Sequence, residues 1–285
     1  MRMRSTITIL TLVASIIGCN KNEMTSKEKT AAPVAGHADI NGISMYYEIY
    51  GEGKPLVLLH GAGSTIGTTF GRIIPYLQQH RRLIAVELQA HGRTSDRDKP
   101  ISFEQDADDV AALLAHLKMP KADFLGFSNG GTSVLQIAIR HPEICDRVVA
   151  ASALLKRDGT MPQFWEFMKQ GTLEQMPGQY KEAFLEVTPD SARLYNMFRK
   201  CADRMINFQD VSDEALKSIK CPVLLVNGDH DVATSGHMVA MSHIIPDCSL
   251  AILPGAHGEY MGELVAMRSN QELTVLPVLK NFLGI

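Results

Sequence analysis

The sequence predicts an α/β protein with a mostly parallel central sheet, helices on both faces of the sheet and a helical insertion that lies over it. Two observations support this fold class. Short apolar runs that end in Gly or a polar residue alternate with helical segments, which is the pattern of strands covered on both faces. One long interval, residues 156–220, breaks this alternation and holds no convincing strand. The 285 residues suffice for one large domain or two small ones.

A series of segments has the composition of β-strands. The first, ISMYYEIYG at residues 43–51, alternates like an exposed antiparallel strand. The others are short and continuously apolar, as expected for strands that are buried on both faces. These are PLVLLHG (55–61), RLIAVEL (82–88), ADFLGF (122–127), RVVAASALL (147–155), PVLLVNG (222–228) and SLAILPG (249–255).

The segment from Ser102 to Met119 is the best-defined predicted helix. Ser102 and Gln105 have the spacing of a capping box, and Pro120 stops the helix. One face of this helix carries its apolar residues, which are Val110, Leu113, Leu114 and Leu117.

The interval 156–220 is rich in Met and aromatic residues, and apolar side chains recur at helical spacing from Leu194 to Met205. We therefore expect a helical cap over the sheet. Most of its large apolar residues should serve packing, and only a minority should line a substrate pocket. The residues concerned are Met161, Phe164, Trp165, Phe167, Met168, Tyr180, Phe184, Tyr195, Met197, Phe198 and Met205.

Residues 1–18 have the features of a secretory signal. Arg2 and Arg4 precede an apolar stretch, residues 7–17, that is too short to span a bilayer. The stretch ends at Cys19 and resembles the lipobox of bacterial lipoproteins, in which the cysteine after the cleavage point is lipidated. An ordinary signal peptide or a buried N-terminal strand is also compatible with the sequence. We expect a lipoprotein, exported and anchored through Cys19 to a bacterial membrane at its periplasmic or cell-surface face.

Residues 19–38 are mostly polar, contain several Lys residues and lack periodicity, which predicts a flexible tether before a domain at residues 39–285. The formal net charge is −3 and there is no long basic run, which argues against nucleic acid as a partner. We expect membrane contact through the lipid anchor alone. Four further cysteines lie in apolar contexts and are expected to be buried free thiols, although an exported protein can form disulfides. They are Cys145, Cys201, Cys221 and Cys248.

A tight turn that contains a serine follows one of the buried strands. Residues 126–130, GFSNG, fit the pattern G-x-S-x-G, with a strand before them and the helical segment GTSVLQIAIRHP after them. In such a turn the glycines relieve crowding and leave the hydroxyl of Ser128 exposed beyond the carboxyl end of the strand. The pattern predicts Ser128 as a nucleophile. The alternative is that the glycines only let the helix pack close to the sheet.

A serine nucleophile needs a base, and the base needs an acid that orients it. NGDHD (227–231) follows one predicted strand and PGAHG (254–258) follows the next. The resulting order of Ser, Asp and His along the chain is that of the α/β-hydrolase triad. From about residue 40 to residue 285 the chain resembles the α/β-hydrolase family, in particular its esterases and lactonases with a helical cap.

This resemblance implies roles for particular residues. The family acid stands in a G-x-x-D pattern that matches Asp231, with Asp229 as a competitor, and the family histidine matches His257. The backbone N–H groups that bind the oxyanion match Asn129 and Ala62.

Two more matches concern the loops around this site. His60, in the turn His60-Gly61-Ala62, matches a histidine that braces its loop and is not the base. ELQAHGRTSD (87–96) matches the family turn D-x-x-G-x-G-x-S, with Glu87 in place of Asp and Ala90 in place of Gly. These departures bear on the subfamily more than on the chemistry.

Other chemistries fit the residues less well. Ser128 distinguishes the chain from haloalkane dehalogenases and epoxide hydrolases, which use an aspartate at that position. A metal site at His230, Asp231 and His237 would need a third and fourth ligand at suitable geometry. We expect neither a metal nor a cofactor.

The resemblance therefore implies hydrolysis of a small to medium carboxylic ester or lactone through an acyl-serine intermediate. The same triad could instead support hydrolysis of carbon–carbon bonds or cofactor-free perhydrolysis. A third possibility is a non-catalytic ligand-binding lipoprotein. Such a protein has no physical need for Ser, Asp and His at three separate strand ends, so we expect an enzyme acting on a small molecule.

Overall fold

The computed structural model describes residues 32–266 and 272–285. The predicted signal peptide at 1–18, the lipidation site Cys19 and most of the predicted tether at 19–38 lie outside the described residues. Within the part of the chain that is described, no helix is long and apolar enough to cross a membrane.

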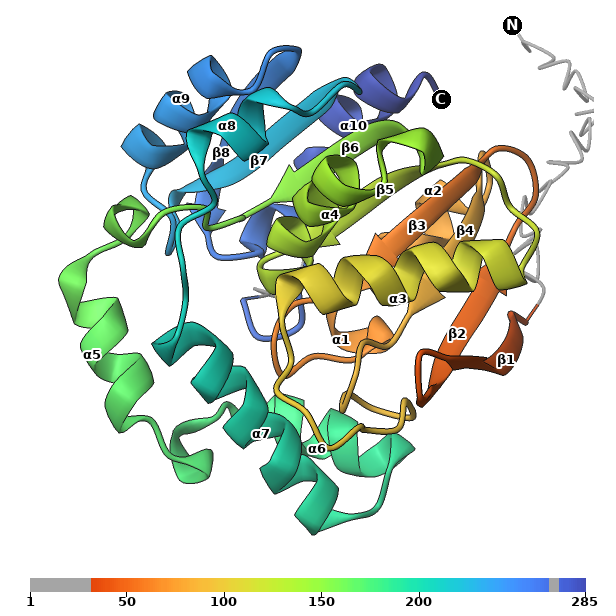
Figure 1. Ribbon diagram of the computed structural model, residues 1–285, viewed down its shortest axis with the longest axis vertical. Helices are drawn as coiled ribbons and strands as arrows, with labels where there is room; N and C mark the ends of the chain where they lie inside the picture. The colour runs from red at the N-terminus through yellow and green to blue at the C-terminus, as the bar shows by residue number, and fades with distance from the viewer. Residues whose placement is uncertain (1–31, 267–271) are drawn as a thin grey trace, which may run out of the picture. The chain divides into compact units, whose positions relative to one another are not determined.

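Eight strands form one sheet in the order β1-β2-β4-β3-β5-β6-β7-β8 (Figure 1). Strand β2 pairs antiparallel with β1 and β4, and all other neighbours are parallel, which confirms the predicted mostly parallel sheet. The strands are β1 (Val34–Ile40), β2 (Ile43–Tyr50), β3 (Pro55–Leu59), β4 (Arg82–Val86), β5 (Ala122–Phe127), β6 (Cys145–Ala151), β7 (Val223–His230) and β8 (Cys248–Ala256).

Helices cover both faces of this sheet, as the apolar strands require. Successive residues of a strand point to opposite faces, and in β3 both sets are fully buried. Val57 and Leu59 pack in the cluster with α3, α4, α8 and α9, whereas Leu56 and Leu58 pack in the cluster with α1, α2 and α10. The helices are α1 (Ile66–Phe70), α2 (Ile74–Leu77), α3 (Phe103–His116), α4 (Asn129–Arg140), α5 (Pro162–Gln170), α6 (Gly178–Val187), α7 (Ser191–Ile206), α8 (Asp213–Lys217), α9 (Ser235–Ile244) and α10 (Val275–Leu283).

Strand β1 corrects the predicted end of the tether. Residues 34–38, assigned to the tether, pair with β2 along the whole length of β1, from Val34↔Ile49 to Ile40↔Ile43. Only Ala38 and Ile40 of this edge strand are buried, so it lacks the apolar run by which the interior strands were found. A usable signal was the Asn41-Gly42 dipeptide, whose residues both have positive φ in the hairpin turn.

Helix α3 begins where its capping residues predict. Ser102 is the N-cap, and its Oγ accepts a hydrogen bond from the Gln105 N–H at 3.1 Å. The Gln105 side chain donates to Asp109 instead of returning to the cap, so only half of the expected capping box forms.

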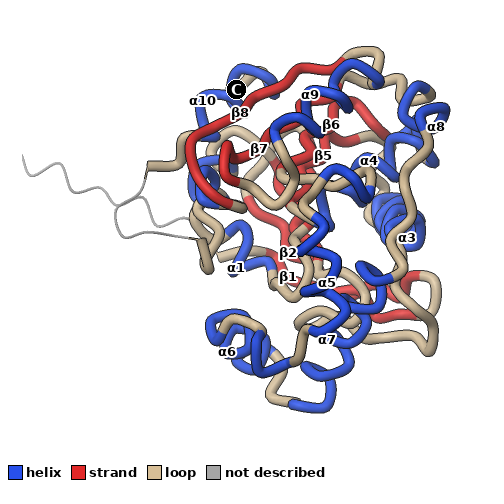
Figure 2. The backbone as a smooth tube through the Cα atoms, turned by 90° about the vertical axis from the view of Figure 1, so that its left-hand side faces the viewer, coloured by secondary structure: helices blue, strands red, loops and turns tan. Residues whose placement is uncertain are grey.

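Between β6 and β7 the described chain contains helices and no strand. Figure 2 shows α5, α6 and α7 together at one side of the sheet, and we refer to residues 156–206 as the cap. Helix α8 lies instead beside α9, so the cap ends before residue 220, the end that the sequence predicted (Figure 1). A buried ion pair joins cap and core, with Arg204 Nη1 2.8 Å from Asp106 Oδ2.

Candidate active site

Ser128 lies at a strained turn between β5 and α4. Its φ of 55° and ψ of −119° are sparsely populated for a residue with a side chain. Gly126 and Gly130 make the turn possible, because an added Cβ would lie 2.0 Å from the Gly130 oxygen or 2.2 Å from the Leu59 oxygen, respectively. The turn therefore has glycines for a steric reason, and it also presents Ser128 to a cavity.

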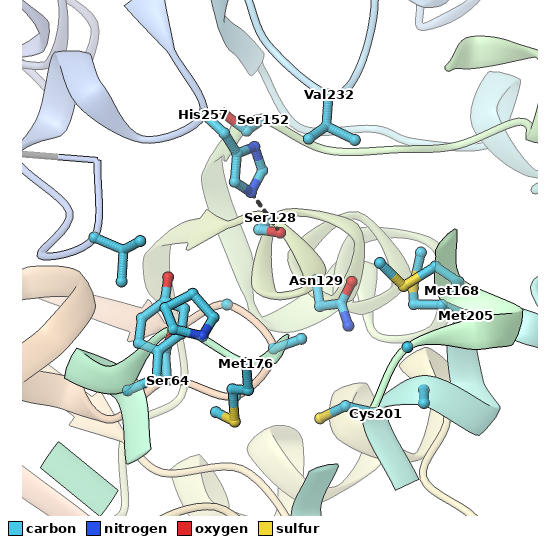
Figure 3. Close-up of a pocket in the computed structure, with 18 of the residues that line it drawn as sticks. Ser64, Ser128, Asn129, Ser152, Met168, Met176, Cys201, Met205, Val232 and His257 are labelled. Atoms are coloured by element: carbon cyan, nitrogen blue, oxygen red, sulfur yellow. Dashed lines mark hydrogen bonds between the residues drawn. The ribbon is translucent and has the colours of Figure 1, made fainter. Parts of the chain in front are cut away.

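Ser128, His257 and Asp231 meet at the carboxyl ends of β5, β8 and β7. The distance from His257 Nε2 to Ser128 Oγ is 3.0 Å (Figure 3), and that from His257 Nδ1 to Asp231 Oδ1 is 2.6 Å. Because the carboxylate accepts the Nδ1 proton, Nε2 is left to accept a proton from the hydroxyl. This arrangement can activate a serine as a nucleophile.

The competing acid, Asp229, lies outside this arrangement. Its Oδ1 accepts the Gly255 N–H at 2.8 Å, and its side chain is 46% exposed. Asp231 contacts His257, and its side chain is fully buried. The geometry thus distinguishes two aspartates that the sequence left as alternatives.

Four donors surround the Asp231 carboxylate. Besides His257, these are the N–H of Val232 at 2.6 Å, the N–H of Gly228 at 3.1 Å and the hydroxyl of Ser152 at 2.6 Å. Burial by itself would raise the pKa of Asp231, but the hydrogen bonds and the charge of His257 hold it below its ordinary value. The carboxylate is therefore ionised and fixed in place beside the imidazole.

The sequence analysis missed Ser152 and Tyr260, which support this acid. Ser152 has a φ of 51°, and its hydroxyl lies 2.7 Å from the hydroxyl of the fully buried Tyr260. Ser152 immediately follows β6, between the strand that leads to Ser128 and the strand that leads to Asp231. A polar residue at the carboxyl end of a central strand was the signal, but it was hidden within an apolar run.

The expected oxyanion donors, Ala62 and Asn129, both line the same cavity as Ser128. Asn129 is the first residue of α4, where an N–H has no intrahelical acceptor. Within residues 32–266 and 272–285, neither backbone N–H donates a hydrogen bond to another residue. Both are thus available to a negatively charged oxygen.

Two buried histidines brace the loop that contains Ala62. His60 accepts the Leu88 N–H at Nε2 (3.1 Å), and its Nδ1 lies 2.8 Å from the Gly61 oxygen. His91 accepts the Gly63 N–H at Nε2 (3.1 Å). Burial lowers the pKa of His60 and lowers that of His91 further, so both rings act as neutral hydrogen-bonding groups. His60 contacts neither Ser128 nor Asp231 in the hydrogen bonds of the described residues, and His91 escaped the sequence analysis.

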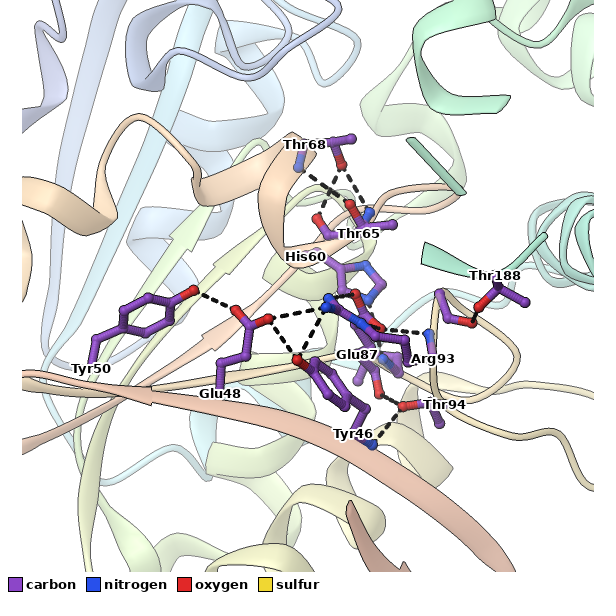
Figure 4. Close-up of polar contacts among 12 residues, drawn as sticks. Tyr46, Glu48, Tyr50, His60, Thr65, Thr68, Glu87, Arg93, Thr94 and Thr188 are labelled. Carbon is purple, nitrogen blue, oxygen red and sulfur yellow. Dashed lines mark hydrogen bonds and ion pairs between the residues drawn. The ribbon is translucent and has the colours of Figure 1, made fainter. Parts of the chain in front are cut away.

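The turn at residues 87–96, which contains His91, contacts His60 through the Leu88 N–H and is held by a polar network (Figure 4). Arg93 binds the Glu87 carboxylate with Nε at 3.0 Å and Nη2 at 2.6 Å, and it also reaches Glu48 at 3.1 Å. Glu87, which stands where the family has Asp, is therefore paired and buried. Ala90, which stands where the family has Gly, has a φ of 67°, a backbone conformation that favours glycine.

The cavity at the triad has a volume of about 640 Å³ and lies between the strand ends and the cap. More of the large cap residues line it than the sequence analysis expected, since α5 and α7 both turn apolar side chains towards Ser128. Trp165 and Phe184 are packing residues instead. From the expected set, the lining residues are Phe164, Phe167, Met168, Tyr180, Met197, Phe198 and Met205.

The alternative metal ligands are not brought together. The His230 side chain is 84% exposed, whereas His237 is buried and accepts the Leu155 N–H at 3.2 Å. In the described residues, no group of three or more His, Cys, Asp or Glu side chains could hold a metal ion. Cys145, Cys201 and Cys221 are buried free thiols, as expected, whereas Cys248 is a free thiol that is only partly buried.

Comparison with known protein families decides the wider classification. The model of the alpha/beta hydrolase fold family matches residues 54–197. The chain belongs to the α/β-hydrolase family. Among curated relatives of this hydrolase, the human protein "Serine hydrolase BPHL" is 29% identical over 219 residues, covering 71% of this chain and 70% of the relative. The "3-oxoadipate enol-lactonase 2" of Acinetobacter baylyi is 25% identical over 235 residues, covering 75% of this chain and 86% of the relative.

Solved structures agree with this fold. The enol-lactonase from Burkholderia xenovorans superposes with a TM-score of 0.69 at 20% identity, covering 87% of this chain and all of that one. At this identity the superposition supports the fold of the hydrolase and leaves its substrate open. Family and relatives together identify the chain as an α/β-hydrolase enzyme.

Proposed function

We propose that this α/β-hydrolase cleaves small to medium carboxylic esters or lactones through an acyl-Ser128 intermediate. The observation that supports this most directly is the continuous pair of contacts from Ser128 Oγ to His257 Nε2 and from His257 Nδ1 to Asp231. The serine oxygen is exposed to the cavity and next to a base that is already in the required tautomer.

In the first half-reaction, Ser128 Oγ attacks the carbonyl carbon while His257 Nε2 takes the hydroxyl proton. The carbonyl oxygen becomes an oxyanion that accepts hydrogen bonds from the N–H groups of Ala62 and Asn129. When this intermediate collapses, the ester C–O bond breaks and His257 gives its proton to the leaving oxygen. Asp231 remains ionised and stabilises the imidazolium between these two transfers.

In the second half-reaction, water takes the place of the leaving group. His257 removes a proton from the water as its oxygen attacks the acyl carbon, and then returns the proton to Ser128 as the acid leaves. In a lactone the leaving oxygen stays attached to the acyl group, so the product is one hydroxy acid. The apolar cap residues around the cavity favour an acyl portion that is itself largely apolar.

The decisive experiment measures hydrolysis of 4-nitrophenyl butanoate and of a γ-lactone by the parent and by Ser128→Ala. We expect Ser128→Ala to lose about 10³-fold or more in kcat, because it removes the nucleophile. A fluorophosphonate should label the parent and leave Ser128→Ala unlabelled. The proposal fails if Ser128→Ala keeps the parental rate, or if the parent cleaves only carbon–carbon bonds.

We also propose that the enzyme is exported and anchored by lipid at Cys19. The support is the pattern of Arg2, Arg4 and the apolar residues 7–17, which ends at Cys19. The full-length Cys19→Ser variant should no longer fractionate with membranes. A mature parent with a different N-terminus and an unmodified Cys19 would contradict this proposal.

A further inference from the structure

We propose that Glu263 determines substrate specificity by excluding anionic acyl groups, so that the substrates are esters or lactones whose acyl portion carries no negative charge. This inference rests on the hydrolytic function proposed above and narrows its substrate class. It follows from the position of Glu263 in the cavity wall, from the hydrogen bonds that hold its carboxyl group, and from the lack of a paired Lys or Arg among the described residues.

Glu263 is part of the wall of the catalytic cavity. It follows the His257 loop, where its N–H donates to the Gly258 oxygen at 3.1 Å, and an added Cβ at Gly258 would lie 2.7 Å from the Glu263 Cβ. The residue is only 2% exposed, yet it lines the same cavity as Ser128 and His257. An acyl group bound to Ser128 therefore shares a confined space with this carboxyl group.

Neutral donors hold the carboxyl group in one position. The hydroxyl of Tyr180, from α6 of the cap, donates to Oε1 at 2.7 Å. The N–H groups of Val265 and Ala266 donate to Oε2 at 2.9 and 3.3 Å. These bonds favour the ionised form and prevent the side chain from turning away from an approaching anion.

No Lys or Arg pairs with this carboxyl group among the described residues. Other buried carboxylates of the molecule pair with arginine: Asp106 with Arg204 and Asp123 with Arg81. Glu263 forms no such ion pair, and the described lining of the cavity contains neither Lys nor Arg. The charge of His257 acts on Glu263 without an ion pair between the two side chains, so an anion that enters the cavity meets a carboxyl group that no Lys or Arg of the described lining neutralises.

Two negative charges in a cavity with largely apolar walls repel each other more strongly than in bulk water, because the effective dielectric constant beside protein is lower. Burial raises the pKa of Glu263, although the donors from Tyr180, Val265 and Ala266 and the charge of His257 oppose the shift. The exclusion of anions should therefore weaken as the pH falls and the carboxyl group takes up a proton.

The test compares two esters with the same leaving group and a four-carbon acyl chain. 4-Nitrophenyl butanoate is neutral, and 4-nitrophenyl hemisuccinate ends in a carboxylate. At pH 8 we expect the parent to favour the butanoate in kcat/KM by about 100-fold. Glu263→Gln should reduce this preference at least about tenfold, mainly through the hemisuccinate. Glu263→Ala removes the same charge and serves if the Gln variant does not fold.

Tyr180→Phe is the matched control, because it removes a hydrogen bond to Glu263 but keeps the carboxylate. It should retain most of the parental preference. The proposal is overturned if the parent hydrolyses both esters equally well, if Glu263→Gln leaves the preference unchanged, or if Tyr180→Phe abolishes the preference as fully as Glu263→Gln.

A binding measurement separates this inference from the proposed hydrolysis. The dissociation constants of both esters are measured in Ser128→Ala and in Ser128→Ala combined with Glu263→Gln, neither of which has the nucleophile. If Ser128→Ala binds the hemisuccinate more weakly than the butanoate, and Glu263→Gln removes this difference, the exclusion of anions by Glu263 is supported even if the parent hydrolyses neither ester. Equal binding of both esters to Ser128→Ala overturns it.

Discussion

The loops that carry Asp231 and Glu263 both place a buried carboxyl group near His257, yet their environments have opposite effects. Asp231 is hydrogen-bonded to the imidazole and to three further donors, and its pKa lies below its ordinary value. Glu263 has three neutral donors and no ion pair among the described residues, and its pKa lies above its ordinary value. Burial raises the pKa of both groups and the charge of His257 lowers it in both, but of the two only Asp231 also accepts a hydrogen bond from the imidazole, which accounts for much of the difference.

The comparison shows how one site can use two carboxylates for separate purposes. In the proposed mechanism, Asp231, which contacts His257, orients the base. In the proposed substrate selection, Glu263, which pairs with no Lys or Arg among the described residues, discriminates between substrates by their charge. Variants that remove the charge or a hydrogen-bond donor of either carboxyl group test this difference in role.

The largest effect is expected for Asp231→Asn, which removes the charge but preserves the shape. The amide NH2 can donate a hydrogen bond to Nδ1 of His257, which leaves the ring proton on Nε2, where it faces Ser128 and prevents the ring from acting as a base, so we expect kcat to fall by about 10⁴-fold. Asp229→Asn is the control, and it should change kcat by less than about threefold because Asp229 only holds the Gly255 N–H. A larger loss at position 229 than at 231 would assign the acid role to Asp229. Both are measured with 4-nitrophenyl butanoate.

A smaller effect is expected for Ser152→Ala, which removes one hydrogen bond to Asp231. A hydrogen bond to a charged group contributes about 1.5–3 kcal/mol, so we expect kcat/KM to fall about tenfold or somewhat more. Tyr260→Phe keeps the Ser152 hydroxyl and should cost less. If Ser152→Ala left both kcat/KM and the pH profile unchanged, the orientation of Asp231 would depend on its backbone donors alone.

The smallest effects concern the pH dependence of the free energy of unfolding, which should change in opposite directions in Asp231→Asn and Glu263→Gln. Ionised Asp231 stabilises the fold fully above its ordinary pKa of 3.8, and this contribution is lost as the pH falls through its lower folded pKa. The deficit of Asp231→Asn in the free energy of unfolding should therefore shrink below about pH 4.

Glu263 behaves in the opposite way. Its protonated form stabilises the fold below its ordinary pKa of 4.5, and this contribution is lost as the pH rises through its higher folded pKa. The stability of Glu263→Gln relative to the parent should therefore increase from about pH 4.5 upwards. Urea titrations of both variants at a series of pH values measure these slopes. Slopes of the same sign would contradict the comparison.

The sequence predicted the sheet and the positions of Ser128, Asp231 and His257, because each follows an apolar strand in a short turn. Strand ends of a parallel sheet converge at one edge, so spacing along the chain translates into proximity. The G-x-x-D match already favoured Asp231 over Asp229, and the coordinates were needed to separate the two, since a shift of one or two residues in a loop reverses which side chain faces the imidazole.

The missed contacts share a different property. Tyr180, which was expected in the cap, and Glu263 are 83 residues apart, and Ser152 and Tyr260 are 108 apart, and no local pattern marks either pair. Their contacts arise only when the cap and the His257 loop pack onto the sheet. Strand β1 was missed for another reason, because an edge strand with one exposed face needs few apolar residues.

The position of the cap within the chain has a consequence for the order of folding. Strands β6 and β7 are paired neighbours, with Val148 beside Val223, but the entire cap lies between them in the sequence. Pairing β6 with β7 closes a long loop, and the entropic cost of this closure precedes the stability gained from the paired strands. The helices of the cap form through local contacts, so they can appear sooner. Because Asp231 and His257 both follow the β6–β7 junction in the chain, they can reach Ser128 only after this slow closure. During refolding, catalytic activity should therefore return later than helical structure does.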